Sequence, residues 1–153
     1  MLLNPNLPGR VFPPVGSYLV GRGKVREFTH SVFTTNPIRI NPVAVRAAGH
    51  ADVVTPPTFA AVMVEPAVGQ LFRNPDTGLD PGRVVHGSQS VVYHRDIVAG
   101  DELTTDLTIA SVTERGTHVI ITTSSGIRDS HGHPLSVSAF RACAACRVLA
   151  QGT

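Results

Sequence analysis

Tryptophan is absent from this chain, and aromatic residues make up only 5% of its 153 residues. An apolar core must therefore be built mainly from Val, Ile, Leu and Ala. Two cysteines are too few for a scaffold held by disulfides. No apolar run approaches the roughly 18 residues of a membrane-spanning helix, and the N-terminal residues lack the pattern of a secretion signal. We therefore expect a soluble protein of the cytoplasm that does not enter a membrane.

Charge of one sign is not in excess either. The chain has 13 Lys and Arg residues against 11 Asp and Glu residues, which gives a net charge of +2. Neither nucleic acid nor an anionic membrane surface is expected as a partner of so balanced a chain. The length fits one domain, which can bury about two thirds of the surface of the unfolded chain.

The most prominent feature is an apolar segment over residues 55–72 that begins with a helix-start signal. Thr55 can cap the helix, and Pro56 and Pro57 suit its first turn. Because Pro66 removes one backbone hydrogen bond, we expect a kink or an early end there. Apolar residues recur at helical spacing, so most of the circumference must be covered by other elements. They are Phe59, Val62, Met63, Ala67 and Leu71.

The segments after this helix have the pattern of strands, with short links rich in Gly and Asp that predict antiparallel neighbours joined by hairpins. These strands are expected over residues 84–95, 102–114, 118–128 and 135–149. The chain is therefore predicted to be an α+β protein in which a curled sheet wraps one central helix.

The segments before the central helix are shorter. Residues 1–16 are rich in Pro and Gly and predict an extended arm rather than a packed element, which leaves residues 17–150 as a single domain. A short strand is expected over residues 17–20, a helix from Gly21 to about Thr34, and one or two helical turns over residues 42–48.

Five short motifs, in order and at their observed spacings, resemble the MaoC-like dehydratase N-terminal family. The family is also described as FAS1-like dehydratase and includes subunits of the HadA and HadC type. The resemblance covers roughly residues 10–148. Its motifs are GKVREF (23–28), NP (36–37), AGHADVVTPPTF (48–59), RVVHGSQ (83–89) and IVAGDEL (97–103).

The resemblance implies a hot-dog fold, in which a curled antiparallel sheet wraps a long central helix and two such units pair as a double hot dog. It also implies reversible loss or addition of water on (3R)-hydroxyacyl or trans-2-enoyl thioesters of acyl carrier protein or coenzyme A. No cofactor or metal is expected for this chemistry.

The resemblance also exposes a departure. Catalytic members of the wider MaoC group carry an Asp-x-Asn-Pro-Ile-His motif before the central helix, because one group must take a proton while another delivers one. The matching stretch here runs from Thr34 to Arg39 and keeps Asn36, Pro37 and Ile38. The Asp position of the motif is Thr34 and its His position is Arg39. Threonine is too weak an acid or base near neutral pH, and arginine does not release its proton.

Subunits of the HadA type lack the pair in the same way and work beside a catalytic hot-dog subunit while binding the acyl chain. We therefore expect a non-catalytic, acyl-binding subunit that pairs with a catalytic MaoC-like subunit in fatty acid or polyketide biosynthesis. The candidate substrate-binding residues are Asn36, Pro37, Ile38, Thr58, Phe59, Val62, Met63, His86 and Gly87.

Other residues keep alternatives open. His50 and Asp52 offer a second imidazole and carboxylate pair, although a glycine-bounded loop also uses such residues as turn formers. Arg39 can contact a phosphate of the carrier or lie solvated in a loop. His86 and Gln89 are three residues apart, so they face one site only if a bulge occurs at Gly87.

The remaining polar patterns favour structural roles. His131 and His133 fit a hairpin turn better than a metal site. Cys143 and Cys146 form a CxxC but, three apart on a strand, fit small buried side chains better than a redox pair.

Two further hypotheses compete with the leading one. The chain can be an acyl-thioester binding protein outside any dehydratase, or a self-sufficient homodimeric hydratase or thioesterase that uses His50, Asp52 or His86. The sequence does not distinguish acyl carrier protein from coenzyme A as the carrier, nor does it give the length of the acyl chain.

Overall fold

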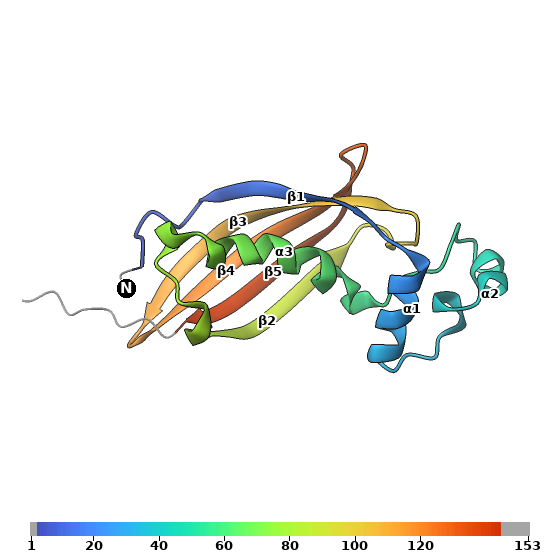
Figure 1. Cartoon of the computed structure of the whole chain (residues 1–153), viewed down its shortest axis with the longest axis horizontal. Coiled ribbons are helices and arrows are strands. Elements are labelled where there is room, and N and C mark those ends of the chain that lie inside the picture. The colour runs from blue at the N-terminus through green and yellow to red at the C-terminus, as the bar shows by residue number, and fades with distance from the viewer. Residues whose placement is uncertain (1–2, 145–153) are drawn as a thin grey trace, which may run out of the picture.

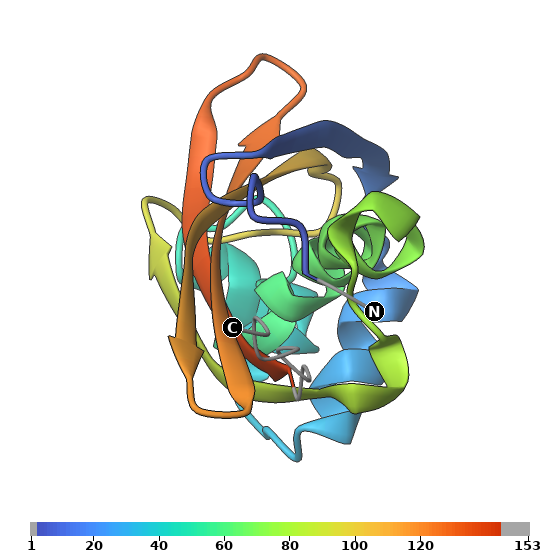
Figure 2. The same cartoon turned by 90° about the vertical axis from the view of Figure 1, so that its left-hand side faces the viewer.

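A computed structural model of the chain describes residues 3–144. One five-stranded antiparallel sheet curls around a single long helix, α3 (Ala60–Arg73), which lies in the hollow of the sheet (Figures 1 and 2). The predicted α+β architecture, with a curled sheet around a central helix, is confirmed.

The sheet has the order β1-β3-β4-β5-β2, and every neighbouring pair is antiparallel. Alternate residues of β3 and β4 face the helix and are buried, as their alternating apolar pattern predicts. The strands are β1 (Val11–Leu19), β2 (Val84–Tyr93), β3 (Glu102–Arg115), β4 (His118–Asp129) and β5 (Pro134–Ala144).

One predicted connection is wrong. β2 and β3 were expected to form a hairpin, but β2 pairs with β5 and β3 pairs with β1 and β4. The link between them is a crossover at the end of the sheet, anchored by buried Ile97 and Ala99 and by a bridge between Val54 and Val98. β2 therefore lies at an edge of the sheet.

Helix α3 differs from its prediction at two places. It continues through Pro66, so the early end is wrong. The lost hydrogen bond is offset because the turns on both sides bury Met63, Val64, Ala67 and Val68 against the sheet. The predicted cap is also wrong, since α3 starts after a 3₁₀ turn, Pro57–Phe59, and Phe59 is its N-cap residue, with no side-chain cap.

A lobe formed by residues 21–52 lies beyond one end of the sheet (Figure 1). It contains α1 (Arg22–Ser31), a 3₁₀ turn (Pro37–Arg39) and α2 (Pro42–Ala47). The sequence predicted both helices close to these bounds. Val25 and Thr29 are the buried face of α1, and Val45 is the buried residue of α2.

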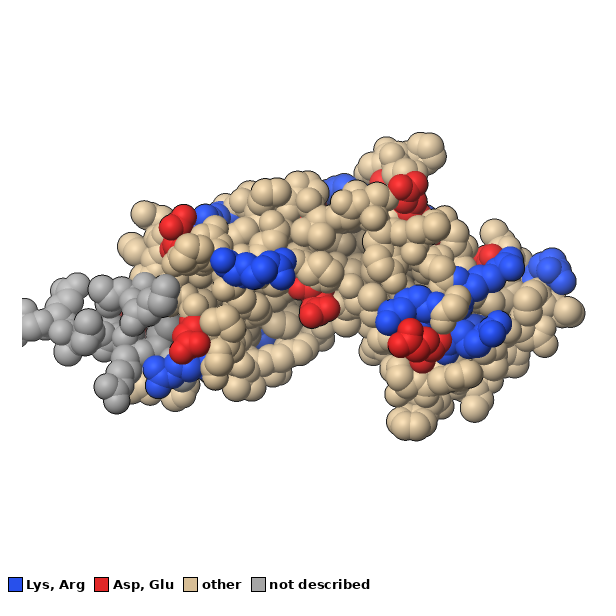
Figure 3. Space-filling model, in the orientation of Figure 1, with Lys and Arg blue, Asp and Glu red and all other residues tan. Residues whose placement is uncertain are grey.

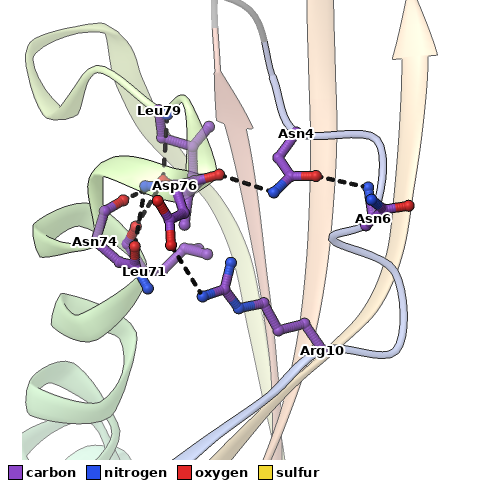
Figure 4. A network of polar contacts seen from close by, with 8 residues as sticks. Asn4, Asn6, Arg10, Leu71, Asn74, Asp76 and Leu79 are labelled. Carbon is purple, nitrogen blue, oxygen red and sulfur yellow. Dashed lines mark hydrogen bonds and ion pairs between the residues drawn. The ribbon is translucent and has the colours of Figure 1, made fainter.

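The N-terminal segment packs against the domain, contrary to the expected arm. β1 begins at Val11 rather than at residue 17, and Leu7 and Phe12 are buried in the core. Asn4 donates to the backbone oxygen of Asp76 at 3.0 Å, in the loop after α3, which carries the 3₁₀ turns Pro75–Thr77 and Pro81–Arg83 (Figure 4). The extent of one domain up to residue 150 stays a prediction.

Residues 3–144 contain no helix with both the length and the hydropathy needed to cross a membrane.

Candidate functional site

Two adjoining cavities lie between α3 and the edge strand β2, and a third continues them past the start of α3; together the three form what we call the groove. The cavity at one end has a volume of about 280 Å³ and shares Ala61 and Gln89 with the middle cavity of about 360 Å³. The middle cavity shares Pro57 and Tyr93 with a smaller one of about 90 Å³. The groove therefore follows α3 over most of its length.

The two ends of the groove differ in chemistry. The wide end, which is the cavity of about 280 Å³, is lined mainly by apolar side chains such as Val68 and Phe72 of α3 and Phe140 of β5. Its polar lining residues are Glu65, His86 and Gln89. The narrow end is polar and is lined by Arg39, Tyr93 and Asp96 beside Pro56 and Ile97. Such an arrangement suits an elongated ligand that has an apolar tail and a polar head.

A bulge in β2 brings His86 and Gln89 into the same cavity. The pairing of β2 with β5 shifts between His86 and Ser88, which leaves Gly87 as the extra residue, and both side chains then line the wide end. The His86 ring stacks on Phe140 with 4.6 Å between ring centroids. The condition that the sequence set for a shared site, a bulge at Gly87, is therefore met.

Arg39 holds the narrow end together. Its Nη1 donates to the backbone oxygen of Thr55 and, at 3.5 Å, to that of Val54. Burial lowers the pKa of the Arg39 guanidinium, while the nearby Asp96 and Tyr93 act in the opposite direction. Since an arginine stays protonated in proteins, Arg39 binds backbone oxygens as a fixed cation and transfers no proton.

Thr34 and Asn36 have local structural roles. The Thr34 hydroxyl oxygen accepts from the backbone N–H of Asn36 at 3.5 Å, and the Asn36 side-chain oxygen accepts from the N–H of Ile38 at 3.2 Å. Asn36 thus caps the 3₁₀ turn that carries Arg39. Asn36, Pro37 and Ile38 do not line the groove, so their substrate contact stays a prediction.

The predicted pair of His50 and Asp52 is not formed. Asp52 accepts from Arg22 Nε at 2.8 and 2.9 Å, and this hydrogen bond lowers the pKa of the Asp52 carboxyl. His50 instead lies with its Nε2 3.9 Å from Asp96 Oδ2, beside the narrow end of the groove. The sequence analysis missed Asp96, although it directly precedes the quoted motif IVAGDEL.

The other candidate residues are distributed around α3. Thr58 lines the middle cavity, whereas Phe59 is fully buried in the core. Val62 and Met63 line a separate hollow on the β1 side of α3, together with Tyr18. The residues of α3 that do line the groove, Ala61 and Val68 among them, were not singled out, because helical spacing does not say which margin of the apolar face stays open.

The histidines of the β4–β5 turn are held by a carboxylate. Asp129 accepts from the backbone N–H groups of His131 and His133, both at 2.9 Å. This is the hairpin geometry that the sequence favoured. Cys143 is a free, half-buried cysteine of β5, while Cys146 lies outside the described residues.

The curled antiparallel sheet around one long central helix is the hot-dog fold. The chain matches the family described as "FAS1-like, dehydratase domain region" over residues 6–137 and therefore belongs to it. Curated relatives carry the name UPF0336 protein. The one from Clavibacter michiganensis is 51% identical over 132 residues, covering 86% of this chain and 89% of the relative. The one from Streptomyces griseus is 42% identical, covering 86% and 88%.

Solved structures agree with the family. The HadBC complex, a (3R)-hydroxyacyl-ACP dehydratase of Mycobacterium tuberculosis, contains a chain 25% identical to this one with a TM-score of 0.80, covering 92% of this chain and 99% of that chain. A MaoC-like dehydratase is 26% identical with a TM-score of 0.84, covering 92% of this chain and 43% of that one. The (R)-hydratase of A. caviae, 18% identical with a TM-score of 0.69, covers 88% and 94% and shares the fold. The resemblance to FAS1-like dehydratases and the predicted hot-dog fold are thus confirmed.

Proposed function

We propose that this chain is the non-catalytic, acyl-binding subunit of a heteromeric dehydratase that acts on (3R)-hydroxyacyl thioesters in fatty acid or polyketide biosynthesis. The observation that carries the proposal is the pair of residues at positions 34 and 39. Removal of water needs one group that accepts a proton and one that donates a proton. Thr34 and Arg39 can do neither near neutral pH, and Arg39 is already bonded to the oxygens of Val54 and Thr55.

The groove supports the acyl-binding part of the proposal. Its apolar wide end suits the hydrocarbon tail, and its polar narrow end, next to the degenerate motif, suits the thioester head. The middle cavity connects the two ends and is lined by residues 57–61 on one side and by β2 on the other. With about 1.5 Å of rise per helical residue, the stretch from Thr58 to Phe72 is about 20 Å long, which suits a chain longer than a crotonyl group.

The unpaired edge of the sheet at β2 supports the proposal that a partner subunit binds this chain. β2 pairs with β5 on one side and with no strand of residues 3–144 on the other. An unpaired edge of ten residues readily accepts a strand of another chain, and Val85 and Val92 on it are exposed. Pairing there with a second hot-dog subunit would continue the sheet and bring a catalytic pair next to the groove. HadBC, among the similar structures, is itself a complex of this kind of dehydratase.

The proposal is tested by assaying hydration of crotonyl thioester with this chain alone, with a hot-dog subunit that has an intact Asp and His pair, and with both. We expect activity only when the second subunit is present and its Asp and His are intact. Thr34→Val should leave the rate of the complex within about twofold, since Thr34 transfers no proton. Full activity of this chain alone would overturn the proposal.

One observation favours a second function, a self-sufficient hydratase. His50 and Asp96 lie 3.9 Å apart beside the cavity that Arg39 lines, so they offer an imidazole and a carboxylate at the place where the motif lacks them. Were they to act, His50→Asn or Asp96→Asn would each lower the rate of the chain alone by about a hundredfold or more. Asp52→Asn is the matched control, because Asp52 is bonded to Arg22 and lies away from the groove lining.

A further inference from the structure

Phe33 has a backbone conformation and an exposure that the fold of this chain does not explain. Its φ is +55°, the one positive φ of a residue other than glycine among residues 3–144, and its side chain is 92% exposed. It follows the last turn of α1, where the Phe33 N–H donates to His30 at 3.1 Å and the Thr34 N–H donates to Thr29 at 3.2 Å. This is the Schellman arrangement, whose left-handed position is usually glycine.

A phenylalanine at this position raises the free energy of the isolated chain for two reasons. Its Cβ makes the left-handed conformation strained, and its ring lies in water without contributing to the core. The same lobe also exposes Val32, Ile40 and Val43, although its buried face is small. A lobe of this size that exposes four large apolar side chains is a candidate contact surface for another molecule.

The lobe is also the positively charged part of the molecule. Residues 21–52 contain five Lys and Arg residues and two acidic residues, whereas acidic residues slightly outnumber basic ones in the rest of the chain. Figure 3 shows Lys and Arg side chains gathered over α1 and α2. Arg22 and Lys24 form ion pairs with Asp52 and Glu27. Arg26 and Arg46 are exposed and have no carboxylate partner among residues 3–144, so they remain free for an outside anion.

The position of the lobe connects it with the groove. Arg39 belongs to the lobe and also lines the narrow, polar end of the groove. A molecule bound to the lobe would therefore place its acyl thioester at the narrow end of the groove, where the head of an acyl thioester is expected.

We propose that the lobe is the docking surface for an acidic protein that carries the acyl group as a thioester. Phe33 supplies the apolar contact, and Arg26 and Arg46 supply the electrostatic attraction. This inference rests on the proposed acyl-binding function and deepens it by naming the carrier. A protein is favoured over free coenzyme A because the cations are spread over two helices and an apolar ring stands among them, whereas a small carrier needs only cations at the mouth of the groove.

The test measures the affinity of the full-length chain for a purified acyl carrier protein loaded with an acyl group, and separately for crotonyl-CoA. Phe33→Gly removes the ring and fits the left-handed conformation, so we expect its Tm to rise by about 2–4 °C while its affinity for the carrier protein falls by about tenfold or more. Stability and binding then change in opposite directions, which a general loss of structure does not produce. Affinity for crotonyl-CoA should be unchanged.

A charge variant tests the electrostatic part. Arg26→Glu combined with Arg46→Glu should weaken carrier binding by about tenfold at low salt, with a smaller effect near 300 mM salt. Arg115→Glu is a control for charge reversal outside the lobe, since β3 begins beside Leu19 next to the lobe and Arg115 ends that strand at the other end of the sheet.

Unchanged carrier binding by Phe33→Gly and by the charge variant would overturn the inference. So would a Phe33→Gly variant that binds the carrier normally but fails to assemble with the catalytic subunit, because the lobe would then be a subunit interface. Hydration of crotonyl-CoA by the two-subunit complex does not depend on a carrier protein. The proposed function is therefore tested independently.

Discussion

Arg39 lies at the end of the Thr34–Arg39 stretch that resembles the MaoC motif, and the structure gives it a structural role that can be measured. Its guanidinium joins the 3₁₀ turn Pro37–Arg39 to the backbone of Val54 and Thr55, just before the central helix. Arg39→Ala removes the donor and leaves those two buried residues with carbonyl oxygens that lose a charged partner. The variant should therefore lower the free energy of unfolding without changing the fold.

The magnitude follows from one strong and one weak hydrogen bond. A hydrogen bond from a charged donor contributes about 1.5–3 kcal/mol, and the contact to Val54 at 3.5 Å adds little. Because Arg39 is only partly buried, we take the lower part of this range, about 1.5–2 kcal/mol. For a chain of this length, each kcal/mol changes Tm by about 2–4 °C, so Tm should fall by about 3–8 °C.

Urea unfolding and a thermal scan measure this loss. Arg39→Lys keeps the charge but not the planar fork, so it should retain about half of the stabilisation. Arg26→Ala is the matched control, since Arg26 is an exposed cation of the same lobe without an ion pair among residues 3–144, and its change should stay within about 0.5 kcal/mol. An Arg39→Ala variant as stable as Arg26→Ala would refute the structural role assigned to Arg39.

Three further predictions concern other parts of the chain. The hydrogen bond from Arg22 lowers the pKa of Asp52, so the stabilisation from this contact is present above the ordinary carboxyl pKa of about 4 and is lost as pH falls through the lowered value. The difference in urea stability between wild type and Asp52→Asn should therefore shrink between pH 7 and pH 3. A constant difference would contradict this. Ser125 has a buried hydroxyl with no partner among residues 3–144, so Ser125→Ala should leave the unfolding free energy unchanged or raise it by up to about 1 kcal/mol in denaturant titration, and a larger loss would reveal a missed partner. A Cβ at Gly87 would lie 3.3 Å from the backbone oxygen of Arg141, so Gly87→Ala should shift the bulge and reduce the rise in Tm that an acyl ligand produces. Gly21→Ala should not reduce that rise, because a Cβ at Gly21 meets nothing within 4 Å.

The sequence predicted those elements whose signal is local. Alternation along β3 and β4, the short helical turn of α2 and the apolar spacing of α3 all arise from contacts within one element or one hairpin, and the structure confirms them. It predicted only the last residues of β1, because Pro13 and Pro14 interrupt the strand pattern, and an edge strand tolerates prolines where a central strand does not. Nor did it show that packing on the sheet would hold α3 together through Pro66.

In the candidate site as well, the sequence predicts some features and only the tertiary structure shows the others. The bulge at Gly87 was recognised as a condition, but only the register of β2 against β5 shows that it occurs. The partner of His50 is Asp96 rather than Asp52, since Arg22 binds Asp52 across the lobe. Sequence distance gave no reason to connect residues 50 and 96.

By itself, the sequence determined which chemistry positions 34 and 39 cannot perform, because the acid and base strength of Thr34 and Arg39 depends first on residue type. The tertiary structure decided where a ligand can lie. The groove is built from side chains of α3, β2, β5 and the lobe, which are separated by up to a hundred residues and meet only when the sheet curls around the helix. A cavity is a property of packed surfaces, so no pattern within a single segment contains it.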